Sequence, residues 1–338
     1  MLWSMNPLQM INAFVLPVVV INEGDRIAAM NHPAQAMLGT DCTGLHYITA
    51  LRQPALLDAI EGVQRDGNAR TTRYLGNSHG ADTTFRVHVA RADTQVVLSF
   101  EDTTALEAAG QMRRDFVANV SHEMRTPLTA ISGFIETLRG PARDDAGARD
   151  RFLGMMQQEA GRLQRLVDDL LSLARVEDSE RDRPLGRVDL TDLCRRTVAE
   201  MAPHAQGSRL AFTAPDGDIS VQGDADQLRQ VLVNLIENAL KYGGAQVDVT
   251  LHPPATEARL RGMGVRLEVR DDGAGIDSHH IARLTERFYR VDSHRARDVG
   301  GTGLGLAIVK HILNRHRGRL LIASEVGQGS VFTAILPV

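Results

Sequence analysis

Two chemically capable side chains, His122 and Glu123, stand next to each other in the stretch DFVANVSHEMRTPLTAISGF (115–134). When each residue is turned by about 100° from the one before it, as in an α-helix, the apolar residues of this segment fall on one stripe. The stripe consists of Phe116, Val120, Met124, Ile131, Phe134 and Leu138. His122 falls outside the stripe, and Thr126 lies one turn further along the helix. The pattern predicts an exposed imidazole with a carboxylate and a hydroxyl group near it.

Two glycine-rich segments lie in the second half of the chain. DDGAGI (271–276) follows a predicted strand, and GGTGLGLAIVKHIL (300–313) opens a predicted helix. Glycines let a backbone approach a phosphate, and a helix N-terminus offers free N–H groups and a positive dipole. Plain turns are the alternative for either segment taken alone. A P-loop is excluded because no GKS or GKT occurs, and a dinucleotide fingerprint is disfavoured because a polar stretch precedes Gly300.

A predicted helix, DADQLRQVLVNLIENALKY (224–242), carries polar groups on one face. Asn234, Asn238 and Lys241 are spaced at i, i+4 and i+7, while apolar residues recur at 228, 231, 232, 235, 236 and 239. An amide oxygen can bind Mg²⁺, and a lysine can meet a phosphate. An ordinary polar stripe is the alternative when this helix is read alone. Either Asp224 or Asp226 can cap its N-terminus.

Four regions position these groups. We expect a mixed α+β domain over 8–103, a helical hairpin over 104–178, a charged linker over 179–187 and an α/β domain over 188–338. The second helix of the hairpin has apolar residues at helical spacing from Phe152 to Leu173. One hairpin buries little apolar surface alone, so two hairpins are expected to pair as a four-helix bundle in a homodimer.

Composition excludes several classes of protein. A net charge of −4 argues against non-specific nucleic-acid binding, and the two cysteines lie far apart, which suits structural thiols in a reducing compartment. No apolar run approaches the roughly 20 residues needed to span a bilayer. We therefore expect a cytoplasmic chain without a membrane segment. Any association with a membrane would be through a partner protein. A zinc site of the HExxH type is excluded, since Thr126 stands where the second histidine would be.

Five motifs occur together in a fixed order: SHEMRTPL, NLIENALKY, DDGAGI, RFYRVD and GTGLGLAIVK. This order resembles the sensor histidine kinases of two-component systems, over about 110–338. SFEDTTALEAAGQMRRDFVANVSHEMRTPL looks most like the phosphate-regulon sensor branch of that family, and region 8–103 resembles a PAS sensory domain. The implied fold is multidomain: an α+β PAS-like domain, a dimeric helical hairpin and a Bergerat-type ATP-binding α/β sandwich, which is not a Rossmann sheet.

The resemblance implies a role for each residue around the histidine. His122 would accept the phosphoryl group, and Glu123 would orient the imidazole or take its proton. Thr126 would position water for dephosphorylation of a partner, and Pro127 would kink the helix. The histidine faces outward because both a nucleotide and a partner must reach it.

The resemblance also implies an ATP and Mg²⁺ site in the second half. Asn238 would be the main Mg²⁺ ligand, with Asn234 in support and Lys241 near a phosphate. Asp271 would accept the adenine amino group, and Arg290, in a lid, would meet the γ-phosphate. The other residues assigned to the nucleotide are Tyr242, Gly273, Gly275, Phe288, Gly301, Thr302, Gly303, Leu304 and Gly305.

The implied activity is ATP-dependent phosphorylation of His122, followed by transfer to an aspartate in the receiver domain of a response regulator, with dephosphorylation of that regulator as a second activity. Two other classes stay open: a degenerate kinase that only senses and scaffolds, and an ATPase of the same fold that drives a conformational change. The intact His122, Asn238, Asp271 and glycine loop argue against the degenerate kinase, and the phosphoacceptor helix argues against the ATPase.

Three features of the sequence have no place in this scheme. Where many relatives read His-Gly-Gly, this chain reads His316-Arg317-Gly318, and we expect a surface turn that tolerates the change. The stretch PPATEARLRGMG (253–264) reads as a long hairpin loop without an assigned role, and His279 and His280 read as lid-surface residues.

Overall fold

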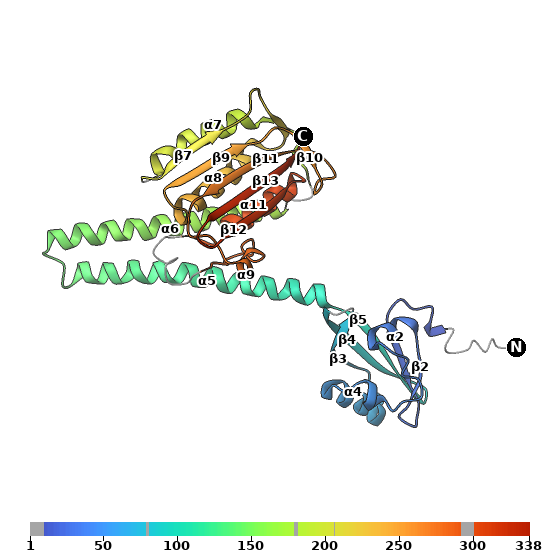
Figure 1. Ribbon diagram of the computed structural model, residues 1–338. Helices are drawn as coiled ribbons and strands as arrows, with labels where there is room; N and C mark the ends of the chain where they lie inside the picture. Colours follow the sequence, from blue (N-terminus) through green and yellow to red (C-terminus); the bar gives the residue numbers. More distant parts are fainter. Residues whose placement is uncertain (1–9, 79–80, 179–181, 206, 292–300) are drawn as a thin grey trace. The chain divides into compact units, whose positions relative to one another are not determined.

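The computed structural model describes residues 10–78, 81–178, 182–205, 207–291 and 301–338 (Figure 1). The chain falls into two units, Met1–Val117 and Ala118–Val338. Among the described residues, no helix is both long enough and apolar enough to cross a membrane.

The first unit contains an antiparallel sheet whose strands pair in the order β2-β1-β5-β4-β3. The strands are β1 Val18–Ile21, β2 Ile27–Met30, β3 Arg70–Ser78, β4 Ala81–Ala92 and β5 Gln95–Asp102; the helices are α2 His32–Leu38, α3 Tyr47–Ala50 and α4 Pro54–Asp66. Alternate residues of β4 and β5, such as Val87 and Leu98, are fully buried in one core with Leu56 and Ile60 of α4. This arrangement is consistent with the predicted PAS-like α+β fold, although the sequence patterns did not predict β3 and β4.

Two long helices, α5 (Thr104–Arg139) and α6 (Ala146–Asp178), follow, with a short turn between them. The predicted stripe of α5 is half-buried at each of its six positions, whereas His122 is exposed. Phe134 of that stripe stacks near Phe152 of α6, with 5.6 Å between ring centroids, which places the two helices side by side (Figure 1). The helical hairpin is thus confirmed. Helix α5 continues past Pro127 without a break.

The remaining elements form an α/β sandwich. Its main sheet has the order β12-β13-β11-β9-β7, in which only β7 and β9 run parallel, and β10 pairs with β11. The strands are β6 Arg187–Asp189, β7 Arg209–Thr213, β8 Ser220–Gln222, β9 Gln246–Leu251, β10 Ala255–Glu257, β11 Gly262–Asp271, β12 Arg319–Glu325 and β13 Gly329–Pro337. The helices are α7 Leu190–Met201, η1 Ala202–His204, α8 Ala225–Tyr242, α9 Ser278–Ile281 and α11 Gly305–Arg315. The largely antiparallel sheet confirms that this is not a Rossmann fold.

Helix α8 forms as its sequence predicts. Asp224 is the N-cap, and its carboxylate accepts hydrogen bonds from the backbone N–H groups of Asp226 and Gln227, at 3.0 and 3.2 Å. The apolar residues predicted to face the core are the ones that are buried: Leu228, Val231, Leu232, Leu235, Ile236 and Ala239. Burial of this face leaves the amide-bearing side of the helix for other contacts.

The expectation of a surface turn at 316–318 is wrong for His316 and Gly318, which are both buried. His316 is completely buried, and its ring joins two helices. Nε2 accepts a hydrogen bond from the N–H of Asp224 at the start of α8 (3.0 Å), and Nδ1 donates to the carbonyl of Ile312 in α11 (2.8 Å). These partners require the neutral imidazole, because a protonated ring has no acceptor for the Asp224 N–H. Arg317 is exposed, as expected.

The end of α11 is closed by backbone hydrogen bonds. The N–H of Gly318 donates to the carbonyl of Leu313 (2.7 Å), and the N–H of Arg317 donates to that of Asn314 (2.9 Å). This pattern is a Schellman motif, whose penultimate residue adopts the left-handed backbone conformation. Arg317 adopts it with φ of 59°, although glycine is the residue that favours it.

We predict that acidification loosens the junction between α8 and α11. Burial lowers the pKa of His316 below its ordinary value of 6.5, so the unfolded chain binds a proton more readily than the folded one. The stabilisation by the neutral ring is complete above about pH 6.5 and is lost as the pH falls through the lowered folded pKa. Hydrogen exchange of residues 222–228, corrected for the intrinsic pH dependence, should show this loss of protection between pH 8 and pH 5.

His316→Gln removes the titrating group and should flatten that pH dependence. His204→Gln, a change at an exposed histidine of η1, should keep it. The same pH dependence in wild type and His316→Gln would contradict the assignment.

Candidate functional site

The polar face of α8 forms one wall of the candidate site. Asn234 and Asn238 are half-buried there, and Lys241 forms an ion pair with Glu237 one turn before it (3.1 Å). The Nδ2 group of Asn234 is buried and has no hydrogen-bond partner among the described residues. A buried amide normally has a partner, so this orphan donor indicates a group that the protein is built to receive.

Asp271, at the end of β11, lies at the floor of the site with only 6% of its surface exposed. Its Oδ1 accepts a hydrogen bond from the N–H of Gly273 (2.9 Å), which fixes the carboxylate orientation. Burial raises the pKa of Asp271, and the hydrogen bonds from the backbone of Gly273 and Ser330 oppose that rise. The result is a positioned acceptor in a poorly hydrated place.

The turn after Asp271 is too crowded for side chains. A Cβ atom on Gly275, whose φ is 70°, would lie 1.9 Å from the carbonyl oxygen of Glu325. A Cβ on Gly273 would lie 2.5 Å from the carbonyl oxygen of Tyr242 at the end of α8. These glycines let the turn pack against α8 and β12, and so they shape the floor around Asp271.

The second glycine segment closes the site from the other side. A Cβ on Gly301 would lie 2.9 Å from the hydroxyl oxygen of Tyr242, and one on Gly303 would lie 2.8 Å from the Cα atom of Phe288. Phe288 donates its N–H to the carbonyl of Gly303 (2.9 Å). Leu304, fully buried, anchors the segment to the core.

Gly305 begins α11 directly beside the amide face of α8. A Cβ atom built on Gly305 would lie 3.4 Å from Oδ1 of Asn234. The N-terminus of α11 therefore opens next to the orphan amide, and a helix N-terminus attracts anions. Glycine-lined backbone, free N–H groups and an unpartnered amide make a cradle that fits a nucleotide phosphate chain with its divalent cation.

The structure thus brings together Asn234, Tyr242, Asp271, Gly273, Gly275, Phe288 and the segment 301–305, with Asn238 and Lys241 on the same helix as Asn234. Arg290 is half-buried two residues after Phe288. The central part of the predicted lid, 292–300, lies outside the described residues.

The exposed His122 belongs to a different part of this unit. The neighbouring Glu123 forms an ion pair with Arg162 of α6 (3.1 Å), and the hydroxyl of Thr126 donates to the carbonyl of His122 (3.3 Å). None of the hydrogen bonds or ion pairs seen among the described residues joins His122 to the cradle. The ion pair fixes the position of the Glu123 carboxylate beside the imidazole-bearing turn.

Sequence reasoning missed one residue that touches the cradle. Asp169 of α6 accepts a hydrogen bond from the hydroxyl of Thr302 (2.7 Å), and that hydroxyl also accepts one from the N–H of Leu304 (3.3 Å). Burial raises the pKa of Asp169, an effect that the Thr302 hydroxyl opposes. The sequence does contain a signal for Asp169, because this carboxylate lies between Leu166 and Leu173, which are both buried.

Two family models match the chain. Residues 112–179 match the His Kinase A (phospho-acceptor) domain, and residues 223–338 match the histidine kinase-, DNA gyrase B- and HSP90-like ATPase family. The first match contains His122, and the second contains the whole cradle.

Curated relatives agree with these matches. The phosphate regulon sensor protein PhoR of Pseudomonas aeruginosa is 45% identical over 69% of this chain and 52% of its own length. The sensor protein kinase WalK of Staphylococcus aureus is 31% identical over 95% of this chain and 78% of its own length. The chain spans about half the length of several curated relatives that it matches, with 52%, 53% and 57% of three of them covered.

A solved structure shows the same fold. The crystal structure of histidine kinase ThkA in complex with the response regulator protein TrrA matches with a TM-score of 0.51 and 20% identity, over 95% of each chain. The curated relatives and the family matches together show that the chain belongs to the sensor histidine kinases, in the branch that resembles the phosphate-regulon sensors.

Proposed function

We propose that this chain is an ATP-dependent protein histidine kinase that phosphorylates His122 and passes the phosphoryl group to an aspartate in the receiver domain of a response regulator. The observation that carries the proposal is the combination, in one chain, of an exposed histidine on α5 and a glycine-lined cradle around a buried carboxylate. A nucleotide-driven motor needs only the second of these. The printed title of the ThkA structure names such a regulator as the partner of that kinase.

In the proposed site, Asp271 accepts the amino group of adenine. Its orientation by the Gly273 N–H and its dry surroundings suit recognition of a neutral base edge. Gly273 and Gly275 let the turn after Asp271 pack closely against α8 and β12, and in this proposal Tyr242 and Phe288 border the base. A base without an amino group would leave the buried carboxylate of Asp271 without a hydrogen-bond partner, which costs free energy. This cost is the physical basis of selectivity for adenine.

The phosphate chain lies, in this proposal, between α8 and the segment 301–305. Asn238 is the main ligand of Mg²⁺ and Asn234 supports it, because amide oxygens suit a hard cation. Lys241 and Arg290 supply positive charge to the phosphates, and the N–H groups at the start of α11 face them. Bound Mg²⁺ would neutralise charge on the β- and γ-phosphates, as in other phosphoryl transfers.

The transfer itself requires a neutral imidazole at His122. The unprotonated ring nitrogen attacks the γ-phosphorus, the bond from that phosphorus to the β–γ bridging oxygen breaks, and ADP leaves with the electron pair. In this proposal Glu123, which forms an ion pair with Arg162, accepts the proton from the other ring nitrogen. A receiver aspartate then takes the phosphoryl group, and the imidazole is restored.

The reverse activity is part of the proposal. Thr126 lies one turn from His122, with its hydroxyl bonded to the carbonyl of His122, so it can turn to hold water for hydrolysis of the regulator's aspartyl phosphate. We assign these activities to proposed domains over 8–103 (sensory), 104–178 (dimerisation and phosphotransfer), 179–187 (linker) and 188–338 (ATP-binding).

A homodimer is the expected assembly. Val117, Leu128 and Ile135 form a second stripe of α5, next to the half-buried one, and are 57%, 58% and 41% exposed in the single chain. Pairing of two hairpins as a four-helix bundle would bury this stripe.

The first prediction from this proposal concerns the phosphoacceptor. Wild-type protein incubated with γ-labelled ATP and Mg²⁺ should gain label that survives alkali and is lost in acid. His122→Gln should lose essentially all of it, because the amide has no nucleophilic ring nitrogen. His204→Gln, at an exposed histidine of η1, should keep full labelling. Label that persists in His122→Gln would place the acceptor elsewhere.

The second prediction concerns the adenine contact. Asp271→Asn keeps the shape of the side chain but replaces a carboxylate acceptor by an amide, and it should weaken ATP binding by at least about tenfold, since a hydrogen bond to a charged group contributes roughly 1.5–3 kcal/mol. Calorimetric titration with a non-hydrolysable ATP analogue measures this. Asp248→Asn, in β9 of the same sheet, is the matched control. Equal affinity in wild type and Asp271→Asn would refute the contact.

The third prediction concerns assembly. Ile135→Glu places a carboxylate in the proposed bundle interface, where desolvation of an unpaired charge costs several kcal/mol, so the dimer should dissociate. Light scattering after size exclusion reports the mass directly. Val326→Glu, on the exposed turn between β12 and β13, should leave the dimer intact. A monomeric wild-type protein would contradict the dimer.

A further inference from the structure

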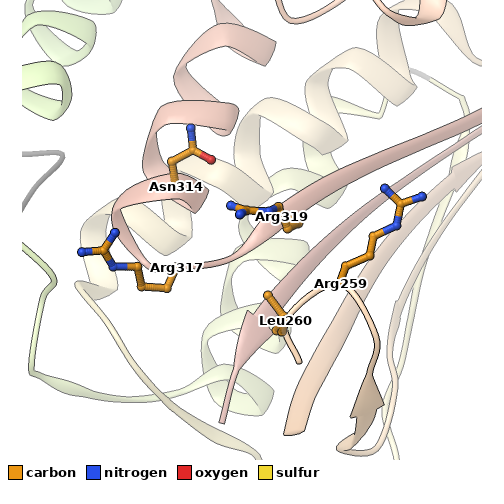
Figure 2. Close-up of a pocket in the computed structure, with 5 residues that line it drawn as sticks. All are labelled: Arg259, Leu260, Asn314, Arg317 and Arg319. Carbon is orange, nitrogen blue, oxygen red and sulfur yellow. The ribbon is translucent and has the colours of Figure 1, made fainter. Parts of the chain in front are cut away.

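A second pocket lies at the end of α11 that is remote from the cradle. Its volume is about 370 Å³, and it is lined by Arg259, Leu260, Asn314, Arg317 and Arg319. Figure 2 shows Asn314 and Arg317 at the helix end and Arg259 and Leu260 on the loop after β10, with Arg319 between them. Gly305 and Arg315 bound the helix, so about 15 Å of helix axis, at 1.5 Å per residue, separates the two sites.

The pocket carries uncompensated positive charge. Among the described residues, no carboxylate forms an ion pair with Arg259, Arg317 or Arg319, and the guanidinium group of Arg319 donates a hydrogen bond to the carbonyl of Gly318 (3.1 Å). The acidic residue of the adjacent hairpin, Glu257, is already held by both nitrogens of Arg266, at 2.6 and 3.0 Å. The chain as a whole has a net charge of −4, so these three guanidinium groups around one cavity are a local excess of positive charge.

Two arginines beside the pocket adopt the left-handed backbone conformation, and at Arg317 this conformation belongs to the Schellman motif that ends α11. Arg317 adopts φ of 59° and Arg261, next to the lining loop, adopts φ of 54°, in the region that favours glycine. The last carbonyls of α11 already accept hydrogen bonds from the backbone N–H groups of Arg317 and Gly318, so the Arg317 side chain is not needed as a cap. Non-glycine residues in this conformation are retained where the surroundings or a function require them.

We propose that this pocket binds a soluble molecule that carries a diphosphate group. Guanidinium groups pair with phosphate oxygens through two parallel hydrogen bonds, and three of them match the charge of a diphosphate. Leu260 offers an apolar contact to the rest of the molecule, and the volume is within the range of small-ligand sites. The pocket is separate from the cradle, and the proposal does not depend on kinase activity.

The test is calorimetric titration of the full chain with inorganic pyrophosphate, with the cradle saturated with ADP. Wild type should bind one equivalent per chain, with an affinity that falls as salt is added. Arg319→Gln and Arg317→Gly should each weaken binding by at least about tenfold, and the second change suits the backbone at that position. Unchanged circular dichroism in both variants shows that the fold is retained.

Arg196→Gln is the matched control. It removes the same charge from α7, where Arg196 pairs with Asp192 (2.8 Å), and should leave the affinity unchanged. No saturable binding, an equal loss in Arg196→Gln, or binding only when ADP is left out would each overturn the proposal. Sedimentation of the protein with phosphatidylglycerol vesicles, lost in Arg319→Gln and without pyrophosphate binding, would also overturn it and assign the arginines to a lipid surface.

Discussion

The neutral imidazole of His316 is the interaction on which the α/β sandwich most depends. It accepts a hydrogen bond from the first turn of α8 and donates one to the last turn of α11, so two helices that carry opposite walls of the cradle are tied at their far ends. Gly223 is part of the same junction, since a Cβ there would lie 2.8 Å from the ring. The cradle lies along the second half of α8 and at the N-terminus of α11, where Asn234 is next to Gly305. The distance between α8 and α11 at the cradle therefore depends on His316, which lies outside the cradle.

Three features of the site are unfavourable in free energy, and the rest of the sandwich must offset them. Asp271 is a buried carboxylate, Asn234 has a buried donor with no partner in the described part of the chain, and Phe288 adopts a left-handed backbone with φ of 63°. Each of these is unfavourable in isolation. They are held by the buried apolar face of α8 and by the strands β11 and β13, which pair over eight residues from Gly264 to Asp271. The polar groups are thus positioned before any nucleotide arrives, which is what phosphoryl transfer requires.

Much of this arrangement could be predicted from the sequence, because local patterns determine it. The stripe of α5, the buried face of α8 and the glycine segments follow from spacing alone, and the order of the motifs indicated the family. Strands β3 and β4 were missed because charged residues and threonines, such as Arg73 and Thr71, occupy their exposed positions and hide the alternation. His316 and Asp169 were misjudged or missed because their partners, Asp224 and Thr302, lie far away in the chain. No local pattern predicts a contact of that range.

The crowded glycines around Asp271 have a consequence for how this protein can vary. At Gly275 and Gly329, an added methyl group would lie 1.9 and 2.0 Å from backbone carbonyl oxygens, not from side chains that can rotate away. Relief would require a strand to move, and both strands concerned belong to the central sheet. Substitution is therefore barred at positions that contribute no chemical group, while a surface position such as Val326 can drift. The mutational tolerance of this unit is set as much by where side chains are forbidden as by which ones are present.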